Sequence, residues 1–457
     1  MKADQHRCFA RLPALVLAAI AGGVGGCQSY QPRPIDAAAH RAAFLGRTAD
    51  SPEVADFARQ LSKANPGGSE TFDPADGLSL SEGEVVALVF NRDLRLARLR
   101  AGVSAAEARH AGLWEDPVLG TDLTRVIQST EHPWKVFTTV GFTIPLSGRL
   151  EVEKKRAAAK HQADIVRAWA QEWTTRVDLK RRWVEWSSAR ERAAVVKELV
   201  ARLDQIVGIV DRVAEAGEMT KVGSRLFKIE RATRAAELAA LESEVGQGEL
   251  AVKSLLGLPP SATVSLTPRL SLSDATIGGS GDAMEPSDRN VALAVARAEV
   301  AIAERSVELE VRKQYPDLTI GPGYGREDGQ DQFLLGLSIP LPFLNRNRQG
   351  IATAEAEREL TRVGYEAASE QVAGDLADAL LRRRTAIAQR ETFEREVVPL
   401  VDEQYADARR IAELGEVNTL VLLETLTRQQ EAKVRLIEAR AAESLAFIRL
   451  EELIGPP

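Results

Sequence analysis

The phrase Ile-Pro-Leu occurs twice, each time between a short apolar stretch and a very long segment rich in Ala, Glu and Arg. The copies are Ile144-Pro145-Leu146 and Ile339-Pro340-Leu341, at an offset of 195 residues. Two later pairs keep nearly the same spacing, at an offset of 198: Gly217-Glu218 with Gly415-Glu416, and Leu255-Leu256-Gly257 with Leu453-Ile454-Gly455. Ordered matches at a nearly constant offset indicate an internal two-fold sequence repeat.

Each copy predicts a helix, a pair of strands, a long helix and a shorter return helix. Repeat 1 covers residues 81–260, with its strand pair at 118–145, and repeat 2 covers residues 288–457, with its strand pair at 318–340. We expect residues 261–287 to form an equatorial linker. The opening helices are expected at 81–112 and 288–314.

The strand segments are about ten residues long, which is the length of an outer-membrane β-strand. Side chains alternate in both second strands, where apolar positions include Val136, Phe142, Phe333 and Leu337. Proline has no N–H for the ladder, so Pro145 and Pro340 should end their strands. Pro342 is predicted to lie in the same strand-to-helix break as Pro340. A polar loop is expected in each pair, at 128–132 and at 325–330.

The long helices are expected at 149–216 and 348–414, with a kink at Pro399. A run of about 67 residues is roughly 100 Å long at 1.5 Å per residue. Each run reaches a glycine, Gly217 or Gly415, before the return helix begins. A glycine just past a helix end is typical of a helical hairpin.

The N-terminus has the pattern of a secretory signal peptide, residues 1–26. Basic residues precede a short apolar stretch that ends in "VGGC" at Val24–Cys27. This ending resembles a bacterial lipobox, which implies an acylated Cys27 as the first residue of the mature chain. Ordinary cleavage is the alternative. Residues 27–80 would then be an N-terminal extension after the lipid anchor.

Composition and motifs exclude several classes of function. The formal charge is −7 and the basic residues are not gathered on one stretch, so nucleic acid is not an expected partner. The five histidines have no metal-ligand spacing, and the Gly-rich stretch at 321–325 lacks the Lys-Ser/Thr of a phosphate loop. We therefore expect no catalytic residues, no metal site, no cofactor and no enzymatic activity. No stretch after Cys27 has 18 consecutive apolar residues, so any membrane crossing would be made by strands.

Three stretches resemble the TolC-like outer-membrane factor family: Leu78–Arg100, Ala412–Thr425 and Ile339–Gly350. The last of these, "IPLPFLNRNRQG", is most similar to the heavy-metal cation efflux branch. The resemblance implies an α+β membrane protein that forms a homotrimer in the outer membrane. Each protomer would give four strands to a 12-stranded β-barrel, continued by a long periplasmic α-helical barrel. Isolated strand edges are not tolerated in lipid, which also favours an assembly.

The same resemblance implies an exit duct of a tripartite efflux pump, anchored in outer-membrane lipid. Its partners would be a periplasmic adaptor protein and an inner-membrane transporter of the resistance-nodulation-division type, and its substrates heavy-metal cations. A drug-efflux channel and a type I protein-secretion channel are the alternatives within the family. A periplasmic coiled-coil scaffold is the alternative outside it.

Two kinds of site residue follow from the resemblance. The tips Gly217, Glu218, Gly415 and Glu416 match the glycine turns that dock the adaptor, although plain helix C-caps would also need these glycines. Glu424 matches a position where acidic residues ring the closed end, but the position one turn earlier is Val421. Glu424 is therefore either a gate residue or an ordinary solvated glutamate.

Overall fold

The computed structural model describes residues 29–64, 72–127, 134–217, 220–272, 289–413 and 419–456. The chain divides into two compact units, Met1–Gly46 and Arg47–Pro457. The described part of the first unit contains the helix α3 (Ala37–Leu45). Asp36 caps this helix, because its side chain accepts a hydrogen bond from the Ala39 N–H. The predicted signal peptide and Cys27 lie outside the described residues.

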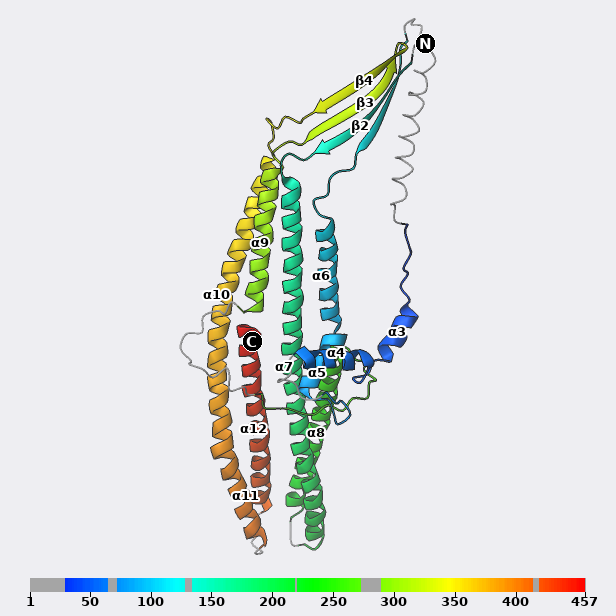
Figure 1. Cartoon of the computed structure of the whole chain (residues 1–457). Coiled ribbons are helices and arrows are strands. Elements are labelled where there is room, and N and C mark those ends of the chain that lie inside the picture. The colour runs from blue at the N-terminus through cyan, green and yellow to red at the C-terminus, as the bar shows by residue number, and fades with distance from the viewer. Residues whose placement is uncertain are drawn as a thin grey trace. The chain divides into compact units, whose positions relative to one another are not determined.

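The second unit contains two successive sets of elements (Figure 1). The first set is α4 (Pro52–Ala64), α5 (Leu80–Phe90), α6 (Arg92–His110), β1 (Val118–Arg125), β2 (Trp134–Ile144), α7 (Arg149–Glu215) and α8 (Lys221–Leu256). The second set is α9 (Val291–Arg312), β3 (Leu318–Glu327), β4 (Gln330–Ser338), α10 (Arg348–Thr392), the π-helix η2 (Phe393–Val397), α11 (Val398–Glu413) and α12 (Thr419–Ile454). The described helices and strands after α5 occur in the predicted order.

The prediction of one continuous helix over residues 81–112 is wrong, because the helix is interrupted at Asn91. The Asn91 backbone leaves the helical region with φ −56° and ψ 128°, and its side chain accepts hydrogen bonds from the N–H groups of the next turn. The same side chain donates to the Leu255 carbonyl at 2.9 Å. Asn290 caps α9 in the same way and donates to the Leu453 carbonyl at 2.7 Å. In both sets, therefore, an asparagine cap closes the end of the return helix.

The kink predicted at Pro399 takes the form of a π-helical turn. Proline lacks an N–H and its ring crowds the preceding turn, so an unbroken α-helical ladder cannot pass through Pro399. The chain widens over Phe393–Val397 instead, and the Val398 N–H donates to the Phe393 carbonyl, five residues earlier. Single π-turns of this kind absorb a local mismatch within a long helix.

The four strands form one antiparallel sheet in the order β1-β2-β3-β4. The polar loop expected at 325–330 is shorter than predicted, because β3 continues to Glu327 and β4 begins at Gln330. The two turn residues, Asp328 and Gly329, both have positive φ, at 50° and 75°. Two such residues give the tight turn that matches strand twist. The other loop, at 128–133, lies outside the described residues.

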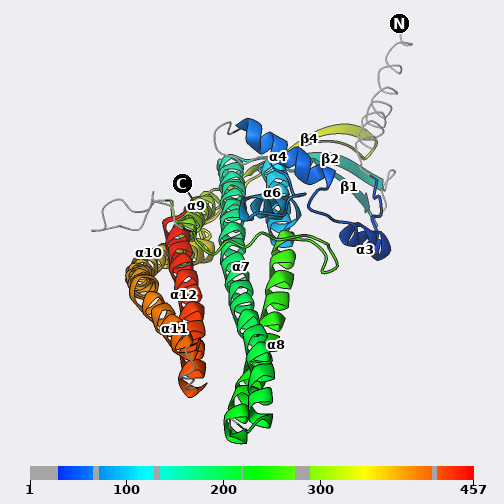
Figure 2. The same ribbon diagram turned by 90° about the horizontal axis from the view of Figure 1, so that it is seen from below.

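The helix α7 is the central packing element of the second unit, because α6, α8, α9 and α12 all contact it. The view from below shows α7 beside α8, and α12 beside α10 and α11, as two helical hairpins (Figure 2). Trp183 and Trp186 on α7 are buried, with ring centroids 6.1 Å apart in an edge-to-face arrangement. Gly83 on α5 makes room for Trp183, since a Cβ there would lie 2.9 Å from the Trp183 ring.

The described part of the predicted linker, 261–272, crosses α7 and α12 and is held by side chains of both helices. Trp183 Nε1 donates to the Thr267 carbonyl at 3.0 Å, and Ser187 accepts from the Arg269 N–H at 3.0 Å. On α12, Ser444 accepts from the Leu272 N–H at 3.1 Å. None of the described helices is both long enough and apolar enough to cross a membrane.

Candidate functional site

One face of the sheet is apolar over nearly its whole width. Directly paired residues point to the same side, and alternate residues along a strand share a side. One continuous set of side chains therefore lies on the same side of all four strands, as the pairs Leu123↔Val136, Phe142↔Ile320 and Tyr324↔Phe333 show. The large side chains of this apolar face are Leu119, Leu123, Trp134, Val136, Val140, Phe142, Ile144, Leu318, Ile320, Tyr324, Phe333, Leu335 and Leu337. At its loop end the face finishes in charged residues, Arg125, Arg326 and Asp331.

The opposite face is polar and rich in glycine. It carries Gly120, Asp122, Thr124, Thr139, Gly141, Thr143, Thr319, Gly321, Gly323, Gly325, Gln332, Gly336 and Ser338, with Val118, Phe137 and Leu334 as apolar exceptions. Lys135 and Glu327 form an ion pair across this face. A sheet with one apolar and one hydrated face matches the strand pattern of outer-membrane proteins.

The glycines of β3 have a steric cause. A Cβ on Gly325 would lie 2.2 Å from the Phe137 ring, and one on Gly323 would lie 2.7 Å from the Thr139 side chain. The stretch 321–325 is therefore a strand packed closely under β2 side chains. This arrangement agrees with the prediction that it is not a phosphate loop.

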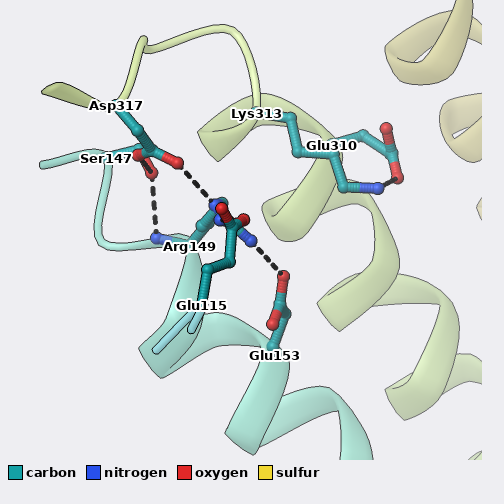
Figure 3. A network of polar contacts seen from close by, with 7 residues as sticks. All are labelled: Glu115, Ser147, Arg149, Glu153, Glu310, Lys313 and Asp317. Atoms are coloured by element: carbon teal, nitrogen blue, oxygen red, sulfur yellow. Dashed lines mark hydrogen bonds and ion pairs between the residues drawn. The ribbon is translucent and has the colours of Figure 1, made fainter. Parts of the chain in front are cut away.

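Arg149 joins three chain segments where the sheet meets the helices (Figure 3). Its guanidinium donates to Asp317, before β3, at 2.8 Å and to Glu115, before β1, at 2.6 Å. It also donates to Glu153 on α7 at 3.3 Å. Burial lowers the pKa of Arg149, but the hydrogen bonds to Asp317 and Glu115 outweigh this effect and leave the pKa raised. Sequence reasoning missed this network, because nothing along the chain links positions 115, 149 and 317.

The predicted strand-to-helix breaks lie at this same junction. Pro145 directly follows β2, while Pro340 and Pro342 follow β4, which ends at Ser338. Both long helices begin after a left-handed residue, Gly148 with φ 69° and Asn347 with φ 52°. Asn347 also ties its loop to α9, since its side chain donates to the Glu310 carbonyl and carboxylate, both at 2.8 Å.

The other end of the helices holds the predicted tips. Gly217 has φ 82°, and a Cβ there would meet no atom within 4 Å, so backbone conformation alone selects glycine. Asp211 fastens α7 to α8 close to this tip, accepting from Ser224 at 2.7 Å and pairing with Lys228 at 2.8 Å. Glu218, Gly415 and Glu416 lie outside the described residues.

Glu424 lies on α12, and its side chain is 60% exposed. It forms an ion pair with Arg428, one turn further on, at 2.6 Å. This intrahelical partner is what an ordinary surface glutamate would have, so the single chain gives the gate assignment no support.

Among the described residues, no group of three or more His, Cys, Asp or Glu side chains could hold a metal ion. His161 is occupied by the Ser104 hydroxyl, at 3.3 Å from its Nδ1. Among the tryptophans of α7, Trp173, Trp183 and Trp186 are buried, whereas Trp169 is 40% exposed.

Comparison with known proteins gives matches to one family. Residues 286–456 match the family model of outer membrane efflux proteins. The chain is 22% identical to the cobalt-zinc-cadmium resistance protein CzcC of Cupriavidus metallidurans, over 78% of this chain and 86% of that protein. The fold matches that of CusC, with TM-score 0.69 and 16% identity, over 94% of this chain and all of that one. It also matches the CmeC outer membrane channel of Campylobacter jejuni, with TM-score 0.70, 14% identity and coverage of 94% and 93%.

The structure is mostly helical with a four-stranded sheet, and its fold is that of TolC-like outer-membrane channels. The second half of the chain, residues 286–456, is similar to outer membrane efflux proteins, and the whole chain has the fold of the CusC and CmeC channels. Proteins of this kind are efflux channels and not enzymes, so the coiled-coil scaffold alternative is set aside.

Proposed function

We propose that the chain is the outer-membrane exit duct of a tripartite efflux pump, and that heavy-metal cations are its substrates. The apolar sheet face carries this proposal, because only lipid or a protein partner can cover so wide a row of exposed apolar side chains. The strands have 8 to 11 residues, close to the length that spans a bilayer when tilted.

A homotrimer would complete the sheet. In one chain, β1 and β4 each have a single neighbour, so both outer edges are open. Open edges in hydrocarbon leave backbone groups without partners, and each such group costs several kcal/mol. Three copies would join β4 to the next β1 and close a 12-stranded barrel, with the polar face toward water. The long hairpins would then form the periplasmic helical barrel.

The helix tips are the proposed contact with a periplasmic adaptor, which in turn would connect to an inner-membrane transporter of the resistance-nodulation-division type. The first tip supports a docking role, since Asp211 and its partners hold the hairpin closed near Gly217. The left-handed conformation of Gly217 also sets the direction in which the chain leaves α7.

Cation export rests on two observations. The curated relative is named for resistance to cobalt, zinc and cadmium, and it aligns with most of this chain. The loop at 339–350 is most similar to the heavy-metal branch of the family. Glu424, tripled by the trimer, would add negative charge at the periplasmic end if its pairing with Arg428 changes on assembly.

The decisive experiment measures assembly and conductance of the purified protein. We expect a detergent-resistant trimer by mass photometry, circular dichroism with both helix and strand signals, and stepwise conductance in planar bilayers. A stable monomer without conductance in bilayers would overturn the channel proposal.

A further inference from the structure

We propose that the loop from Ile339 to Asn347, between β4 and α10, binds the headgroups of anionic phospholipids. This inference rests on the proposed function, which puts the apolar sheet face in a membrane. The loop continues that face directly, because β4 ends at Ser338. Its apolar side chains are among the most exposed in the chain: Leu341 at 71%, Phe343 at 66% and Leu344 at 83%.

The loop also carries positive charge without local compensation. Two arginines carry this charge: Arg346 lies within the loop, and Arg348 begins α10. Both are exposed, and neither forms an ion pair with a described residue. Arg149, at the equivalent break of the first set, contrasts with them: it is 20% exposed and has three carboxylate partners. At the first strand-to-helix break the arginine is thus paired with carboxylates of the same chain. At the second break the two arginines can bind an anion from outside the chain.

The loop is held in place from one side only. Asn347 is bonded to Glu310 on α9, and a Cβ on Gly350 would lie 2.5 Å from the Glu310 carboxylate. Beside the loop is a shallow hollow of about 370 Å³, lined by Arg149, Lys313, Tyr315, Asp317, Pro340 and Pro342. A fixed base with an exposed apolar tip suits insertion at the boundary between acyl chains and headgroups.

The combination of groups specifies the occupant. Large apolar side chains partition into the acyl boundary, while arginines nearby attract anionic headgroups. An uncharged apolar surface would cover the apolar residues but would bring no negative charge to the two arginines. An anionic phospholipid satisfies both, with its phosphate against Arg346 and Arg348 and its acyl chains against Phe343 and Leu344.

The test uses the full-length protein purified in detergent, with phosphatidylglycerol or phosphatidylcholine added, and counts retained lipids by native mass spectrometry. Wild-type protein should retain phosphatidylglycerol preferentially, and high salt should weaken this preference. The double variant Arg346→Gln/Arg348→Gln should bind phosphatidylglycerol roughly thirtyfold less well, because each basic residue near an anionic surface contributes about fivefold. The matched control Arg100→Gln/Arg384→Gln removes two exposed arginines from α6 and α10 and should change nothing.

A second variant, Phe343→Ser/Leu344→Ser, separates lipid from a protein partner. Reduced retention of both lipids with an intact trimer would support the proposal. Loss of the trimer with unchanged lipid retention per protomer would assign the surface to a second copy and overturn it. Equal phosphatidylglycerol retention by wild type and the arginine variant would also overturn it, while the trimer in the same spectra would leave the channel function standing.

Discussion

At the scale of single residues, this chain relies on side chains that serve several segments at once. Asn91 caps α6 and closes the end of α8, and Arg149 connects the segments that precede β1 and β3. Lys180 is shared in the same way, pairing with Glu451 at 2.6 Å and lying 3.9 Å from Glu84. Such shared groups are expected where the axial position of a long helix must be fixed relative to its neighbours.

Glu84 gives a prediction about pH. Burial raises its pKa, and Lys180 and Arg176 offset this only in part. Because the pKa of Glu84 is higher in the folded state than in the unfolded state, protonation of Glu84 favours the folded state. This stabilisation is fully present below the unfolded-state pKa and is lost as the pH rises through the folded-state pKa. Glu84→Gln should therefore increase the melting temperature at pH 7 to 8, and the difference should vanish below about pH 4, where glutamate is protonated in both states. The exposed control Asp378→Asn should show no such trend, and a Glu84→Gln protein that melts lower at pH 8 would contradict the assignment.

At the scale of elements, the two sets of helices and strands repeat the same local solutions. Gly257 and Gly455 both have positive φ, at 71° and 89°, and each leaves no room for a Cβ, which would lie 2.2 Å from the Phe90 carbonyl or 2.1 Å from that of Arg289. The caps Asn91 and Asn290 also lie at equivalent places in the two sets. The sets differ at η2, since only the second long helix contains a proline.

The helix tips give a prediction at this scale. In the proposed pump, Gly217→Pro should abolish adaptor crosslinking and tolerance of heavy-metal salts, because proline fixes φ near −65° and the native φ is 82°. Glu416→Lys should weaken both without altering the backbone. Trimers should still form, because the sheet lies roughly 100 Å away along a helix of 67 residues. Gly208→Ala on α7 is the control, and full metal tolerance in both tip variants would show that the tips are ordinary caps.

At the scale of the whole molecule, the sheet and the hairpins make different demands on their surroundings. The sheet needs an apolar environment on one face and partners at both edges, while the hairpins carry many ion pairs suited to water, such as Arg192–Glu244 at 2.5 Å and Arg231–Asp204 at 2.7 Å. One chain therefore combines a sheet with an apolar face and hairpins with a charged surface, and the Arg149 network lies where the two meet.

The predicted lipid anchor at Cys27 is tested on the mature protein. We expect the N-terminal peptide to begin at Cys27 and to carry a diacylglyceryl group by mass spectrometry. Cys27→Ser should block acylation, while the proposed trimer should still form because its contacts lie in the strands and helices. An unmodified N-terminus beyond Cys27 would show ordinary cleavage and rule out the anchor.

The sequence by itself determined the kinds of element and most of their ends. Helical periodicity, strand alternation and the prolines at 145 and 340 act over a few residues, so they can be recognised in the sequence alone. The break at Asn91 was not predicted, although its cap is local, because the Asn91 side chain accepts from the N–H groups of Asp93 and Leu94. Its contact with the Leu255 carbonyl depends on the tertiary structure. The turn at Asp328 was also misjudged, since strand pairing extended both neighbours into a polar stretch.

Only the tertiary structure decided which faces come together. Alternation shows that Val136 and Phe142 share a side of one strand, but the register with β1 and β3 decides that Leu123 and Ile320 extend the same apolar surface. A shift of one residue would have placed these side chains on opposite faces. The contacts of Arg149 likewise join residues up to 168 positions apart, which chain order does not encode. Local patterns thus fix the elements, and pairing between distant segments fixes which side chains form the apolar and the polar face of the sheet.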